Sequence, residues 1–324
     1  HRYQILPSLR HRNPFTHRDP RRTLTNATTL RIIRGKLQLV VCRREFLFPL
    51  PDSLAFPGAF MRMAVAIFMA ILCSACQITP LPVPPMKVLF VGNSLTYTGN
   101  LPAVFLSLAA ANDKKITTAM IANGGATLSE RLHNGTVKDA LQNENYSHVV
   151  LQERGGDFIC AFGPESCLIA ETATTKLAKL AQAKGVRALL LGSYQMQPGV
   201  SVELVNAEQK AATAANIELV AVSNRFQIAV GTEPTGKWLY QDNTHPGSDL
   251  VLLQAVLLYQ QVFHELPAAS GFQVKAPIFR SNTRFPHGIH KTTDGVDVGT
   301  PMNCSYSSAD LAMILRVIGR MGLE

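Results

Sequence analysis

The stretch that decides the fold is Lys87-Val88-Leu89-Phe90-Val91-Gly92-Asn93-Ser94. A largely apolar run ends here in a Gly-Asn-Ser turn, which is the pattern of a buried β-strand followed by a change of chain direction. A helix is expected next, over residues 102–111. A strand that is apolar on both faces needs cover on both faces, so this stretch predicts a sheet between layers of helix.

The same alternation repeats along the chain, which indicates an α/β domain with a parallel sheet. Further strands are expected at residues 116–122, 148–152, 186–191 and 217–222, and further helices at 128–143, 169–184, 202–215 and 248–263. Residues 265–324 are expected to be loop-rich, with a final helix over 311–321. We predict one domain over residues 86–324.

Composition and charge exclude one class of function for this domain. The 324 residues are 47% hydrophobic and 16% charged, which is enough apolar material for a sizeable core. Of the net charge of +9, all lies in residues 1–62, because residues 63–324 hold nineteen basic and nineteen acidic side chains. The folded body therefore offers no electrostatic case for binding nucleic acid.

The N-terminal segment is predicted to be a leader rather than part of the domain. Residues 1–60 have no sustained apolar period, so we expect them to be disordered or to be upstream sequence outside the native protein. A disordered basic arm that binds nucleic acid or membrane is the alternative. Residues 61–76 combine a basic start, an apolar run and small residues, which predicts a secretory signal peptide. The apolar run is shorter than the roughly 20 residues that a membrane span needs.

The end of this signal peptide suggests a lipid anchor. Leu72-Cys73-Ser74-Ala75-Cys76 resembles a bacterial lipobox with Cys76 as the lipidated residue, and ordinary cleavage nearby is the alternative. Residues 77–85 include four prolines and predict an extended tether. The protein is thus expected to be exported, either periplasmic or attached to the membrane through Cys76. A start at Met86 would instead make it cytoplasmic.

Two motifs could carry chemistry. Ser94 lies where the first strand turns toward the first helix, near backbone N–H groups that can stabilise an oxyanion, although a serine here could also be a turn residue or helix cap. Asp242 precedes His245 by three residues, in a turn before the last long apolar helix. The carboxylate can bind one ring nitrogen and leave the other to face a serine. Capping of that helix is the alternative.

Together these motifs resemble those of the SGNH (GDSL-like) hydrolases. Gly92-Asn93-Ser94-Leu95 is similar to the first block of that superfamily, and Asp242-x-x-His245-Pro246 is similar to the last. The resemblance spans about residues 86–263. It implies a three-layer α/β/α sandwich with a parallel, flavodoxin-like sheet, and a Ser-His-Asp acyl-enzyme mechanism without a cofactor.

The resemblance also implies an oxyanion hole. Its donors would be the N–H groups of Ser94 and of Gly124, with Gly125 as the alternative glycine, and a side-chain amide from the third block. That block usually reads Gly-x-Asn-Asp, whereas this chain has Gln152-Glu153, and Gln152 can donate the same kind of N–H. Glu153 and Arg154 are interpreted as a surface or local ion pair.

The predicted function is that of a serine esterase. Gln followed by Glu is similar to carbohydrate acetylesterase branches such as sialate O-acetylesterases, which favours an acetyl group on a saccharide as substrate. The alternatives are a lipase- or thioesterase-type hydrolase and a non-catalytic envelope- or carbohydrate-binding lipoprotein on the same fold. No residues have metal-ligand spacing or form a phosphate-binding glycine loop, so no metal or cofactor is expected. Cys160 and Cys167 bracket a short loop and could be a disulfide or two reduced thiols.

Overall fold

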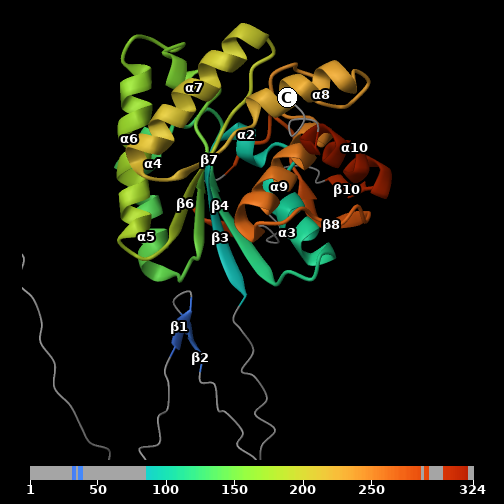
Figure 1. Cartoon of the computed structure of the whole chain (residues 1–324). Helices are drawn as coiled ribbons and strands as arrows, with labels where there is room; N and C mark the ends of the chain where they lie inside the picture. The colour runs from blue at the N-terminus through green and yellow to red at the C-terminus, as the bar shows by residue number, and fades with distance from the viewer. Residues whose placement is uncertain (1–30, 34–35, 39–84, 286–287, 292–301, 320–324) are drawn as a thin grey trace, which may run out of the picture. The chain divides into compact units, whose positions relative to one another are not determined.

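A central sheet with the flavodoxin-like strand order organises the domain. The computed structural model describes residues 31–33, 36–38, 85–285, 288–291 and 302–319. The strand order is β7-β6-β5-β3-β4-β9, in which the first five are parallel and β9 is antiparallel (Figure 1). The strands are β3 (Met86–Gly92), β4 (Ile116–Ala122), β5 (His148–Leu151), β6 (Arg187–Leu191), β7 (Glu218–Val220) and β9 (His290–Lys291).

Helices cover both faces of this sheet, and the alternation of side chains along β3 explains why. Val88 and Phe90 pack into one apolar cluster with α3 (Leu101–Ala111), α8 (Ser223–Thr232), α9 (Ser248–Phe263) and α10 (Ser308–Gly319). Leu89 and Val91 pack into the other with α4 (Leu128–His133), α5 (Thr136–Asn143), α6 (Ser166–Gln182) and α7 (Pro198–Ala215). Figure 1 shows these two helical layers on either side of the sheet. The predicted three-layer α/β/α fold is confirmed.

The strand order also fixes where a site can form. β3 pairs with β4 on one side and with β5 on the other, so the chain leaves β3 and β5 toward opposite faces of the sheet. In open α/β sheets this topological switch point leaves a crevice at the carboxyl ends of the strands. Ser94 follows β3 and Gln152 follows β5, so both lie at that edge.

Some predicted elements differ from those observed. The helix expected over 128–143 is two helices, α4 and α5, because Gly135 between them takes a φ of 73° in the left-handed region. α8 was not expected. The region expected to be loop-rich contains an antiparallel pair, β8 (Phe272–Ile278) and β10 (Met302–Tyr306). In β8 every second residue is buried, which is the period of a half-covered strand.

Residues 81–324 form one compact unit, and the leader belongs to another. Within residues 1–60 the structure describes a short antiparallel pair, β1 (Arg31–Ile33) and β2 (Lys36–Gln38). The predicted signal peptide, Cys76 and the tether to residue 84 lie outside the described residues and stay predictions. In the part of the chain that is described, no helix has the length and apolar content needed to cross a bilayer.

A buried carboxyl group on α7 links that helix to the end of β6. Glu208 is 1% exposed, and one of its oxygens accepts hydrogen bonds from the N–H (2.7 Å) and hydroxyl (3.0 Å) of Ser193. The other oxygen has no partner among the described residues. Burial raises the pKa of Glu208 to about 8, although the two bonds from Ser193 lower it. The folded protein therefore favours the protonated acid.

This pKa predicts that stability falls with rising pH. Between the ordinary value of 4.5 and about 8 the folded state holds a proton that the unfolded state has released, so the Glu208 contribution is complete below that range and is lost through it. The loss amounts to at most about 1.4 kcal/mol per pH unit. In Glu208→Gln this loss should disappear, which denaturant unfolding across the pH range will measure. Glu203→Gln, on the exposed side of α7, is the control. Parallel curves for wild type and Glu208→Gln would contradict the prediction.

Candidate active site

Ser94 is fixed at the sheet edge by a short helix. It is the first residue of α2 (Ser94–Tyr97), which begins directly after β3. The Asn93 side chain caps this helix by accepting a hydrogen bond of 3.0 Å from the N–H of Leu95. Asn93 is itself 1% exposed, so the cap is held inside the protein. The cap therefore sets where the Ser94 hydroxyl lies relative to the strand ends.

His245 reaches Ser94 from a loop 151 residues further along the chain. Its Nε2 lies 2.9 Å from Ser94 Oγ, and its Nδ1 lies 3.0 Å from Asp242 Oδ2. Because a carboxylate can only accept, Nδ1 carries the proton and donates to Asp242, which leaves Nε2 to accept from the Ser94 hydroxyl. The side chains of Ser94, His245 and Asp242, which the sequence predicted to lie together, are joined by two consecutive hydrogen bonds.

The loop that carries Asp242 and His245 is held by several further bonds. Asp242 Oδ1 accepts from the N–H groups of Thr244 and His245, each at 3.0 Å. The Tyr194 hydroxyl donates to the Thr244 carbonyl at 2.8 Å. Asn243 takes a φ of 56°, which closes the turn. The following helix α9 has Gly247 as its N-cap residue, so Asp242 and His245 do not serve as its cap.

The Asp242 carboxyl group is kept ionised by its hydrogen bonds. Partial burial raises its pKa, but donors outweigh this effect, namely the His245 N–H, the Ser281 hydroxyl, the Thr244 N–H and the His245 ring. Together they hold the pKa of Asp242 well below its ordinary value. An ionised carboxylate on Nδ1 is the group that stabilises an imidazolium once Nε2 takes up a proton.

Gln152 has a buried side-chain amide whose oxygen is hydrogen-bonded and whose nitrogen is not. The side chain is 1% exposed, and its Oε1 accepts a hydrogen bond of 2.7 Å from the Thr96 hydroxyl. The Thr96 oxygen accepts in turn from the Asn93 N–H at 3.4 Å, so its own proton points to Gln152. Gln152 Nε2 has no partner among the described residues. A buried donor without an acceptor is costly unless a ligand supplies one.

Thr96 is a residue that the sequence analysis missed. It lies two positions after Ser94 on α2 and is fully buried. The available signal was its position, because a hydroxyl in the first turn of a helix at the sheet edge can reach the end of the neighbouring strand. The structure shows that it does so through Gln152.

Of the two candidate glycines, Gly124 is the one next to α2. A Cβ on Gly124 would lie 3.2 Å from the Tyr97 hydroxyl oxygen, whereas a Cβ on Gly125 would meet no atom within 4 Å. Gly125 has a φ of 70°, which makes it the turn residue of this loop. The geometry therefore favours Gly124 as the glycine whose backbone borders the Ser94 helix.

Glu153 and Arg154 differ from their predicted interpretation. Glu153 is 2% exposed, and it accepts hydrogen bonds from the N–H groups of Leu128 (2.9 Å) and Arg154 (3.0 Å) instead of forming a surface ion pair. Burial and the nearby Asp157 raise its pKa to about 8. Glu153 thus ties the end of β5 to the start of α4, which follows the Gly124 loop. Arg154 pairs with Asp157.

Cys160 and Cys167 form a disulfide, so of the two states left open by the sequence the structure has the oxidised one. Over the described residues, no group of three or more His, Cys, Asp or Glu side chains is arranged to hold a metal ion.

Comparisons with known proteins give likenesses of fold. No family model and no curated protein matches the chain. Solved structures that are similar include a DUF4886 family protein from Bacteroides uniformis, with 15% identity, a TM-score of 0.44 and coverage of 56% of this chain and 84% of that one. The psychrotrophic esterase EstA from Pseudoalteromonas sp. has 17% identity, a TM-score of 0.44 and coverage of 55% and 97%. Axe2, an acetylxylan esterase from Geobacillus stearothermophilus, has 16% identity, a TM-score of 0.45 and coverage of 56% of this chain and 95% of that one.

The bond from Tyr194 to the Asp242–His245 loop can be tested. Tyr194→Phe removes the hydroxyl and leaves the Thr244 carbonyl without its donor. We expect unfolding free energy to fall by about 1 kcal/mol, as for one hydrogen bond. We also expect faster hydrogen exchange at the amides of Thr244 and His245, measured by NMR. Unchanged protection of those two amides would show that Tyr194 does not hold the loop.

Proposed function

We propose that this chain is a serine esterase that hydrolyses carboxylic esters through an acyl-enzyme intermediate. The observation that carries the proposal is the contact of 2.9 Å between His245 Nε2 and Ser94 Oγ. The opposite ring nitrogen, Nδ1, donates a hydrogen bond to the ionised carboxylate of Asp242. A serine hydroxyl is a weak nucleophile until a base takes its proton, and this arrangement supplies both the base and the group that orients it.

In the first step, His245 Nε2 takes the proton from Ser94 as Oγ attacks the ester carbonyl carbon. The imidazolium that forms is stabilised by Asp242 and passes its proton to the departing alcohol. A water molecule then attacks the acyl-enzyme, again giving its proton to His245, and Ser94 leaves with that proton as the acid is released. Each proton taken by His245 is returned within the same half-reaction.

The oxyanion of each tetrahedral intermediate would be bound by three donors, the N–H groups of Ser94 and Gly124 and the side chain of Gln152. The partnerless Nε2 of Gln152 supports its role, since its amide is fixed at the other end by Thr96 before any substrate arrives. Donors that are already oriented need no rearrangement when charge develops, which is why such donors lower the barrier.

A non-catalytic binding protein on this fold is the competing function. The aligned Ser94, His245 and Asp242 favour the enzyme, because binding alone does not require a base on a serine hydroxyl. A fluorophosphonate probe distinguishes the two: an esterase is labelled at Ser94, and Ser94→Ala is not. A wild-type protein that stays unlabelled and hydrolyses no ester would support the binding protein.

The substrate and location stay proposals. Acetyl groups on an envelope or environmental saccharide are the substrate that the Gln152-Glu153 block favours, with a lipase- or thioesterase-type activity as the alternative. Export, and attachment through Cys76, would place the enzyme at the bacterial cell envelope.

Removing the Gln152 amide should slow turnover without unfolding the protein. Losing one oxyanion donor costs about 3–4 kcal/mol in the barrier, so Gln152→Ala should lower kcat for nitrophenyl acetate by two to three orders of magnitude, on the order of 10² to 10³. KM should change far less, because the interaction strengthens in the transition state. A kcat close to that of wild type would remove Gln152 from the site.

Thr96 is expected to act through Gln152. Thr96→Val keeps the shape but no longer donates to Gln152 Oε1, so the amide can rotate, and we expect kcat to fall by about tenfold, the worth of one hydrogen bond. Thr96→Ser retains the hydroxyl and should restore most of the rate. If Thr96→Val lowers kcat equally in a Gln152→Ala background, the effect does not pass through the amide.

A further inference from the structure

A cavity of about 370 Å³ is lined by residues that adjoin Ser94 and His245 in the sequence. Its wall includes Leu95, which follows Ser94, and Asn243 and Thr244, which precede His245. The remainder of the wall is mostly apolar, with side chains of Ala161, Phe162, Tyr194, Met196 and Leu239. This volume falls within the range of small-molecule sites, about 300–1,000 Å³, and exceeds what an acetyl group fills.

Phe162 is an exposed aromatic side chain that is nevertheless held in place. It is 58% exposed, whereas most phenylalanines of this domain are buried in the two cores. The Arg154 guanidinium lies 4.2 Å from the centre of its ring. The backbone of Gly156 also approaches the ring closely, since a Cβ there would come within 3.2 Å of it. The ring is thus supported although it faces solvent.

The support behind Phe162 is rigid. Arg154 donates two hydrogen bonds, of 2.8 and 2.6 Å, to the two carboxylate oxygens of Asp157. Asp157 is 3% exposed, so this ion pair has one buried partner and a fixed geometry. A guanidinium held flat in this way can stack on an aromatic ring.

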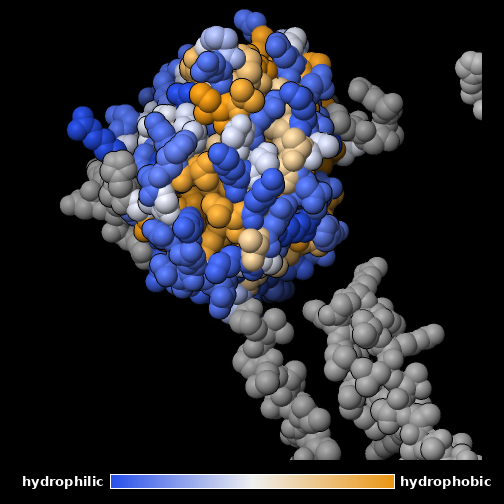
Figure 2. All heavy atoms as spheres, turned by 90° about the vertical axis from the view of Figure 1, so that its left-hand side faces the viewer, coloured by the Kyte–Doolittle hydropathy of each residue, from blue (hydrophilic) through white to orange (hydrophobic). Residues whose placement is uncertain are grey.

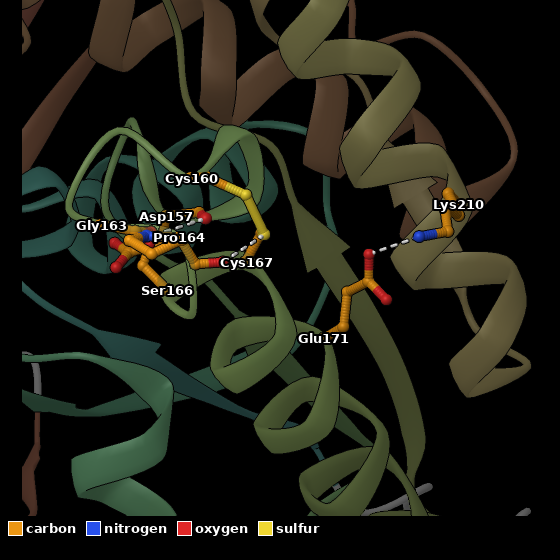
Figure 3. The surroundings of a disulfide bond; sticks show 8 residues. All are labelled: Asp157, Cys160, Gly163, Pro164, Ser166, Cys167, Glu171 and Lys210. Carbon is orange, nitrogen blue, oxygen red and sulfur yellow. Dashed lines mark hydrogen bonds and ion pairs between the residues drawn. A yellow bond between two sulfur atoms is a disulfide. The ribbon is translucent and has the colours of Figure 1, made fainter.

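The loop that carries Phe162 is closed covalently. The Cys160–Cys167 disulfide joins its two ends (Figure 3). Inside the loop, the Ser166 hydroxyl donates to the Gly163 carbonyl at 2.9 Å. At its far end α6 begins, and the Lys210–Glu171 ion pair of 2.9 Å links α6 to α7. The loop therefore has little freedom to move Phe162 away from the cavity.

Phe162 also lines a second cavity, of about 500 Å³. The walls of this cavity carry the charged side chains of Glu153, Arg154 and Asp157, together with Thr127 and Ser129. Its wall also includes the apolar side chains of Pro164, Ile169 and Ala170. Phe162 belongs to the walls of both cavities, so its ring lies where one adjoins the other.

We propose that Phe162 is the specificity-determining residue of the esterase, and that the apolar cavity binds a linear hydrocarbon group of the ester. This proposal rests on the proposed function and names its substrate class, an ester with an alkyl chain of several carbons. The chain would lie along Leu95 and Met196 and end against the Phe162 ring. The ring would thus limit the length of the chain that the apolar cavity accepts.

The alkyl chain could belong to the acyl group or to the alcohol, and two substrate series separate these sources. The acyl series is nitrophenyl acetate, butyrate, hexanoate and octanoate. The alcohol series is ethyl, butyl, hexyl and octyl acetate, which keeps acetyl as the acyl group. For wild type, kcat/KM should rise in one series by at most about fourfold per methylene group and then level off or fall. A response in the alcohol series keeps the predicted acetyl group and replaces the saccharide with an alkyl alcohol, whereas a response in the acyl series replaces the acetyl group.

Two variants of Phe162 should shift the chain length with the highest kcat/KM in opposite directions. Phe162→Ala opens the apolar cavity toward the second cavity, so the preferred chain should become longer. Phe162→Trp fills more of the cavity, so the preferred chain should become shorter. Two opposed shifts cannot arise from a general loss of stability.

Leu168→Ala is the matched control. Leu168 is 65% exposed on α6, close to the loop in sequence, and lines neither cavity. Figure 2 shows the face of the molecule that carries α6, where apolar side chains interrupt a hydrophilic surface. This variant should keep the wild-type profile.

The outcomes that overturn the proposal are distinct from those that overturn the esterase. If kcat/KM does not depend on chain length in either series, or if its dependence is the same in wild type and both Phe162 variants, the proposal for Phe162 is wrong. The proposed esterase activity would not be affected by that result. If wild type hydrolyses no ester, or if Ser94→Ala is as active as wild type, both the proposed esterase function and the role proposed for Phe162 are wrong.

Discussion

The position of β3 between β4 and β5 is the constraint on which the site depends. Since the chain leaves β3 and β5 toward opposite faces, a crevice forms at the sheet edge where their carboxyl ends meet. Ser94, Gly124 and Gln152 each follow one of these three strands, so the order of the sheet brings them together from separate parts of the sequence. His245 then arrives from the loop before α9, the helix that packs on α3.

Buried polar side chains make this edge rigid. Four of them, each at most 2% exposed, are Asn93, Thr96, Gln152 and Glu153. Each forms hydrogen bonds with a backbone group or with another of the four. Burying so many polar groups is unfavourable unless they are paired. The pairing is nearly complete, and the exception is the Gln152 N–H. A single unpaired donor in an otherwise satisfied network is the arrangement expected where a ligand completes it.

The sequence predicted the parts of this structure that are encoded locally. Continuous apolar runs identified the parallel strands, and Asp242-x-x-His245 was recognisable because one short turn places the carboxylate on the ring. Thr96 and Tyr194 could not be assigned in this way, since their roles depend on contacts with Gln152 and Thr244. Gly135, which divides the helix expected over 128–143, was visible in the sequence but was outweighed by the helical pattern around it. β8 was missed although its alternation of apolar and polar residues is a local strand signal, since the continuous apolar runs that identified the parallel strands are absent there.

The two sides of the site are held by different means, and the difference follows from exposure. On the side of Ser94, the buried side chains of Asn93, Thr96 and Gln152 hold the site through hydrogen bonds, which are strong in a dry environment. Phe162 stands in solvent, where packing cannot hold an aromatic ring on both faces. A disulfide and a bidentate ion pair replace that packing. An exposed ring that is this firmly supported is more consistent with contact to a ligand than with a loose surface loop, because a loop without such contact has no need of either constraint.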